Sequence, residues 1–185
     1  DFEARLVASK PARRRGSEPH RTETLVGRQA IEGSIADFGS LHTELSVPIT
    51  ARLRWLLTWA QIHDEWTPTT FVVRNARSTA VLGAALMAER SVDGRREFVA
   101  LGHGTSASTR LAARDPRVAR QLAKLIVDHV RAVDDPWTLH LQQLDPEDPV
   151  ARLLAQQLPN AELAPDQWVP KVVFGAQPDI NDHLS

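Results

Sequence analysis

Three side chains that can accept a proton lie in and around one strand-like segment of the second half of the chain. Glu97 begins the apolar run 97–101, His103 follows this run in a glycine-containing loop, and His140 lies in the next strand-like segment. Carboxylates and imidazoles are the side chains that most often remove a proton from an amine near neutral pH. Glu97, His103 and His140 are therefore the candidate catalytic bases.

Each histidine also has a purely structural interpretation. The triplet Gly102, His103 and Gly104 permits a close backbone approach or an exposed imidazole, and it equally fits a β-bulge and turn. His140 alternates with leucines, which places it on the polar side of its strand, where a hydrogen-bonded sheet histidine is the ordinary alternative to a base. Both alternatives stay open.

A second set of chemically suggestive residues surrounds the start of a long helix. Asp115 can cap this helix and Pro116 can occupy its first turn. The set consists of Arg110, Arg114, Arg117 and Arg120. Guanidinium groups bind phosphate in a forked geometry, and a helix N-terminus favours anions. The alternative is a solvated outer helix face, on which Asp115 would repel a phosphate.

Alternating and helical patterns give the elements that position these residues. The expected order is β, α, α, β, β, β, α, β, α, β, which mixes hairpins with strand-helix-strand crossovers. Apolar residues on two faces of the second helix, including Trp55, Trp59 and Ile62, predict that it is buried on more than one side. The expected strands are 22–26, 70–74, 79–87, 97–101, 137–141 and 168–174, and the expected helices are 28–45, one after Pro48, one from Pro116 and one from Pro149.

Length and composition exclude several classes of function. A chain of 185 residues with 22 basic and 23 acidic side chains fits one globular domain without general attraction to nucleic acid or anionic lipid. The sequence contains no run of about 18 apolar residues, so it predicts no membrane-spanning helix. The absence of cysteine excludes disulfides and thiolate chemistry and agrees with a cytoplasmic location. No histidine spacing suggests a metal site.

Polar, proline-containing termini frame the expected domain. Residues 1–20 read as a flexible leader, because a segment with few apolar residues cannot offset the entropy of ordering. Residues 176–185 read as a flexible tail. The globular domain is expected over residues 21–175.

The element order over residues 21–174 resembles the GNAT acyltransferase fold. The tryptophan-rich helix 52–60, the hairpin strand end 81–87 and the loop 101–106 resemble one half of the duplicated Fem-type and cellulose-biosynthesis-type acetyltransferase-like proteins. The resemblance implies an α/β fold with a central mixed sheet of six or seven strands flanked by helices. It also implies transfer of an acyl group from acetyl-CoA, or another acyl-CoA, to a small-molecule or peptide amine.

The cofactor motif of that family is Arg or Gln, two residues, Gly, one residue, then Gly or Ala. Arg114 and Ala119 match it, whereas Arg117 stands at the glycine position and Pro116 removes a backbone N–H. The resemblance implies that an N–H near Leu101 or Gly102 polarises the thioester carbonyl. The tyrosine that often reprotonates the leaving thiolate has no counterpart, because the chain contains no tyrosine. The full set of implied cofactor contacts is Leu101, Gly102, Gly104, Arg110, Arg114, Arg117, Val118 and Ala119.

Two other functions fit the same residues. The chain could be a non-catalytic GNAT-like half that packs on a second such domain, or on a second copy of itself, and shapes the acceptor site. The departures at Pro116 and Arg117 and the missing tyrosine favour this alternative. A third possibility is an α/β module of another family that shares only the element order.

Overall fold

A computed structural model describes residues 19–105, 109–145 and 147–161 of the chain. Most of the expected leader, the tail and the expected strand 168–174 lie outside these residues. The elements are β1 (His20–Val26), α1 (Arg28–Glu32), α2 (Ile35–Glu44), the 3-10 turn η1 (Ile49–Ala51), α3 (Leu53–Ile62), β2 (Thr67–Asn75), β3 (Val81–Val92), β4 (Arg95–Ala100), β5 (Leu111–Ala113), α4 (Pro116–Arg131), β6 (Trp137–His140) and α5 (Pro149–Gln157).

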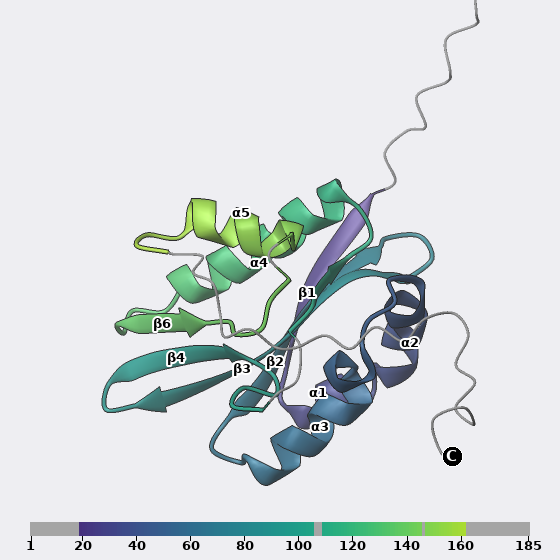
Figure 1. The fold of residues 1–185 in the computed structure, drawn as a ribbon. Coiled ribbons are helices and arrows are strands. Elements are labelled where there is room, and N and C mark those ends of the chain that lie inside the picture. The colour runs from purple at the N-terminus through teal and green to yellow at the C-terminus, as the bar shows by residue number, and fades with distance from the viewer. Residues whose placement is uncertain (1–18, 106–108, 146, 162–185) are drawn as a thin grey trace, which may run out of the picture.

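The strands form one mixed sheet with helices on both faces. Its order is β1-β2-β3-β4-β6, and the short strand β5 also pairs with β3. Neighbouring strands are antiparallel except β4 and β6, which are parallel and joined through α4. Figure 1 shows α1, α2 and α3 against one face and α4 and α5 against the other. The mixed α/β fold expected from the sequence is confirmed.

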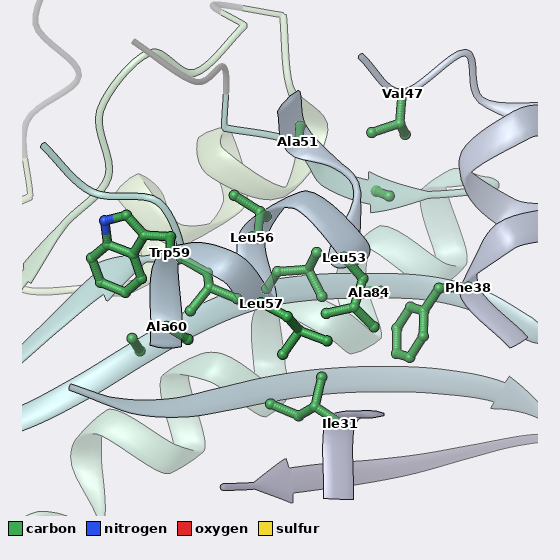
Figure 2. Packing of buried hydrophobic residues seen from close by; sticks show 14 of the residues in the cluster. Ile31, Phe38, Val47, Ala51, Leu53, Leu56, Leu57, Trp59, Ala60 and Ala84 are labelled. Carbon is green, nitrogen blue, oxygen red and sulfur yellow. The ribbon is translucent and has the colours of Figure 1, made fainter. Parts of the chain in front are cut away.

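An apolar core fills the space between α3 and the face of the sheet that this helix covers. Leu53 and Leu57 of α3 and Phe38 of α2 are at most 5% exposed and pack in one cluster with Ala84 of β3, as Figure 2 shows. On the second face predicted for this helix, Trp59 is buried, at 7% exposed, but the other two residues are not. Trp55 is 56% exposed and Ile62 is 73% exposed, because no described residue covers that side of α3.

The opposite face is covered by α4, which begins and ends close to the expected positions. Val118, Leu122 and Ile126 recur at helical spacing and are fully buried against the sheet. Asp115 caps the helix and Pro116 occupies its first turn, as predicted. Helix α5 packs on α4 and begins with the same aspartate-proline device. No helix of the described ranges is long and apolar enough to cross a membrane.

Two elements differ from the expected pattern. The expected helix 28–45 is two helices, because the first ends at Gly33 and the second begins after Ser34. The segment expected as a loop between β4 and α4 contains β5, which continues the edge of β3 beyond β4. Strands β4 and β5 therefore pair with the same edge of β3, one beyond the other.

Candidate active site

The parallel strands β4 and β6 bring two of the predicted bases to one face of the sheet, Glu97 from within β4 and His140 from the carboxyl end of β6. In the parallel register Glu97 lies beside Thr138, and Val99 lies beside His140. Phe98 and Leu139 point toward α4 and α5, so Glu97 and His140 point to the opposite face. Glu97 is partly buried and His140 is exposed. Neighbouring carboxyl ends of parallel strands are a common position for binding sites in α/β sheets.

His103 joins them from the loop after β4. Its ring lies edge-on to His140, with 5.4 Å between the centroids, and at 6.2 Å from the ring of Trp66. Trp59 of α3 donates a hydrogen bond of 3.1 Å from Nε1 to the His103 carbonyl, which ties the loop to the helix. The three predicted bases, separated by up to 43 positions in sequence (140 − 97), therefore occupy one region.

The surroundings of His103 favour its neutral form. Burial lowers the pKa of His103 below the ordinary value of 6.5, and the positive charges of His140 and Arg90 lower it further, while Glu97 acts in the opposite direction. A neutral imidazole at neutral pH can accept a proton. The same shift makes His103 a weaker base than a free imidazole, so its case as the base rests on its neutral form and on its position beside His140.

Glu97 is held by a partner that the sequence did not suggest. Arg90, its cross-strand neighbour on β3, binds the Glu97 carboxylate at 2.7 Å and lies 4.1 Å from the centre of the Trp66 ring. The ion pair occupies this carboxylate. We therefore assign Glu97 an electrostatic influence on His103. Alternation along β3 could have identified Arg90, because it follows Ala88 and Leu86 on the same face.

The loop that carries His103 has the geometry of a turn. Gly102 and Gly104 have φ angles of +93° and +78°, and the His103 N–H donates to the Ala100 carbonyl at 3.0 Å. The Leu101 N–H donates to the Leu86 carbonyl at 2.9 Å and so cannot donate to a ligand. The N–H groups of Gly102 and Gly104 donate to none of the described residues, and Gly102 is the nearer of the two to the strand end.

The start of α4 does not offer the backbone donors that a diphosphate needs. The N–H groups of Arg117 and Val118 donate to Oδ1 of Asp115 at 2.8 and 2.9 Å, and the Ala119 N–H donates to the Asp115 carbonyl at 2.9 Å. Pro116 has no N–H. The helix cap thus uses the available donors and adds a negative charge, so this N-terminus does not fit a diphosphate as the family motif would hold it.

The other implied cofactor residues are also engaged elsewhere. Arg114 forms an ion pair with Glu44 of α2, and Arg110 lies 3.2 Å from Asp145. The side chains of Val118 and Ala119 are fully buried in the core under α4. No group of three or more potential metal ligands occurs within the described ranges. The residues best placed for chemistry are those around His103.

No protein-family model and no curated protein matches the sequence. A solved crystal structure of a probable acetyltransferase is similar over 85% of this chain and 98% of its own, with a TM-score of 0.46 and 11% identity. At this level the similarity carries no argument about ligand or reaction.

Proposed function

We propose that this chain is an acyltransferase domain that moves an acyl group from a thioester, with acetyl-CoA as the donor to test, to an amine. The observation that supports this most is the convergence of Glu97, His103 and His140 on one face of the sheet, around the neighbouring strands β4 and β6. A primary amine attacks an acyl carbonyl only in its neutral form, so a neutral imidazole at this position supplies the required base.

In the proposed reaction His103 takes the proton that the amine nitrogen loses as it bonds to the acyl carbon. The carbon-sulfur bond breaks, and the proton is finally taken by the leaving thiolate. Arg90 and Glu97 stay paired, which keeps the Trp66 side of the site fixed. The Gly102 N–H is the backbone donor nearest the His103 turn and is the candidate for polarising the carbonyl.

The N-terminus of α4, whose backbone N–H groups already donate to Asp115, favours a second candidate function. Because Asp115 occupies the donors of Arg117 and Val118, the domain could bind an amine at the His103 region without binding a nucleotide donor. Such a non-catalytic module would act with a second domain or a second copy of the chain. This is the duplicated-protein alternative raised by the sequence.

Release of the donor thiol distinguishes the two functions. The chain contains no cysteine, so a disulfide reagent detects free CoA without background from the protein. Acetyl-CoA and its truncated analogue S-acetyl-N-acetylcysteamine are each incubated with amino acids, polyamines and a lysine peptide. The acyltransferase proposal expects thiol release that His103→Gln abolishes and that the control His20→Gln preserves, because His20 lies on the distant edge strand β1.

The rates of thiol release with the two thioesters test whether the capped N-terminus of α4 binds the diphosphate of the donor. Similar rates with both thioesters would show that the diphosphate contributes little, as the capped N-terminus of α4 suggests. Amine binding seen by calorimetry without thiol release from either donor would support the non-catalytic module. If His103→Gln released thiol as fast as the wild type, the proposed base would be wrong.

A further inference from the structure

A separate groove lies between α2 and the segment formed by η1 and α3. It has a volume of about 470 Å³ and is bordered by Phe38 and His42 of α2 and by Leu53 and Trp55 of α3. The α3 residues that line it run from Leu53 to Thr58. Trp59, which contacts the His103 loop, does not line the groove.

His42 is the histidine of this groove. Its residue is only 4% exposed, and its ring makes no hydrogen bond with any described residue. Burial, followed by the positive charge of Arg52, lowers the pKa of His42 to about 4, so the ring is neutral at neutral pH. A neutral ring offers one N–H donor and one acceptor to a ligand in the groove.

The charges around the groove point to an anion. Arg54 is exposed and forms no ion pair with any described residue, and Arg52 uses its Nε to donate to the Val47 carbonyl at 3.0 Å. None of the residues that line the groove is acidic. Two guanidinium groups without a lining carboxylate favour a negatively charged head group.

The remaining walls are apolar. Phe38 and Leu53, whose positions Figure 2 shows, are at most 2% exposed and form part of the floor. Trp55 and Ile49 line the same groove, yet they are 56% and 70% exposed. Large apolar side chains exposed together beside a groove mark binding surfaces more often than isolated ones do. The ligand should therefore carry an apolar body.

We infer that this groove binds a small carboxylic acid with an apolar chain or ring, its carboxylate at Arg54, Arg52 and His42 and its apolar part against Trp55, Ile49 and Phe38. A neutral imidazole can donate one N–H to a carboxylate oxygen, so His42 adds a donor to the two guanidinium groups. A volume of about 470 Å³ falls within the usual range for small-molecule sites. The inference is independent of the proposed acyl transfer.

The test compares two ligands that differ in the charge of the head group. Decanoate and decyltrimethylammonium, both kept below their micellar concentrations, are titrated into the whole chain by isothermal calorimetry and tryptophan fluorescence. We expect decanoate to bind and the cationic analogue to bind at least tenfold more weakly. Equal binding of both would show adsorption to an apolar surface and would overturn the inference.

Substitutions inside and outside the groove test whether decanoate binds there. Arg54→Gln should weaken decanoate at least tenfold, which is about 1.4 kcal/mol, whereas Arg77→Gln, an exposed arginine of the β2–β3 turn, should leave its affinity unchanged. His42→Phe keeps an aromatic ring and removes the polar atoms, and it should also weaken decanoate. If His42→Phe does not fold, the comparison of Arg54→Gln with Arg77→Gln tests the site by itself. Equal weakening by both arginine substitutions, or by neither, would contradict the site.

Discussion

A glycine that lets the sheet approach α4 gives the sharpest stability prediction. A Cβ built on Gly83 of β3 would lie 2.5 Å from Cγ1 of Val118 and 3.2 Å from the Ala112 carbonyl oxygen. Carbon atoms in contact are ordinarily about 3.5–4.0 Å apart, so the strand or the helix must move. Val118 is fully buried, so its Cγ1 cannot turn out into solvent. Gly83→Ala should lower the free energy of unfolding by about 1–3 kcal/mol.

The same geometry predicts that a second substitution relieves the first. Val118→Ala alone removes two methyl groups from the core, at about 0.8 kcal/mol each, and leaves a small cavity. In the double variant the methyl group of Ala at position 83 enters the space that Cγ1 has left. The double variant should therefore be more stable than the sum of the single effects by about 1 kcal/mol or more. The Ala112 carbonyl limits complete recovery.

Urea denaturation followed by circular dichroism measures all three variants. Gly39→Ala is the matched control, because Gly39 lies inside α2, is exposed, and has no atom within 4 Å of the position that a Cβ would take. Helix propensity alone should stabilise that variant by about 0.8–1 kcal/mol. If Gly83→Ala unfolded with the same free energy as the wild type, the close packing of β3 on α4 would be refuted. It would also be refuted if the effects of Gly83→Ala and Val118→Ala simply added in the double variant.

Three further predictions concern buried polar groups. Arg74 is 8% exposed and bonds Glu23 at 2.5 Å, so Arg74→Met should lower the free energy of unfolding in urea by about 2–3 kcal/mol. The pKa of Glu89 is lowered, first by its contact with His129. This carboxylate therefore stabilises the fold above pH 4.5 and loses that effect on acidification. Glu89→Gln should reduce the fall in melting temperature below pH 4.5. Because the pKa of His42 is lowered to about 4, the unfolded chain takes up a proton first, and stability should fall between pH 6.5 and 4 in the wild type but less in His42→Phe.

The sequence predicts most of the elements because their signals are local. Alternation identifies the strands of the sheet, and the pairs Asp115-Pro116 and Asp148-Pro149 fix the starts of α4 and α5. The strand β5 escapes prediction because three residues carry no periodicity. The exposed side of α3 escapes it because residue type shows that Trp55 is apolar but not whether anything covers it.

The candidate site is predictable in its residues but not in their roles. Side-chain chemistry identifies Glu97, His103 and His140, and the parallel register of β4 and β6 brings them together. The pairing of Glu97 with Arg90 depends on the β3–β4 register, which the sequence does not specify. The cap by Asp115 is predictable, but its occupation of two helix donors is visible only in three dimensions.

The central claim is that His103, His140 and Glu97 form one coupled site with His103 as its base. Nuclear magnetic resonance titration of the His103 ring, assigned by comparison with His103→Gln, tests it directly. The pKa of His103 should lie below 6.5, fall further in Glu97→Gln and rise in His140→Gln, since these neighbours act in opposite directions. A pKa of His103 that is the same in the wild type and in both variants would contradict the account.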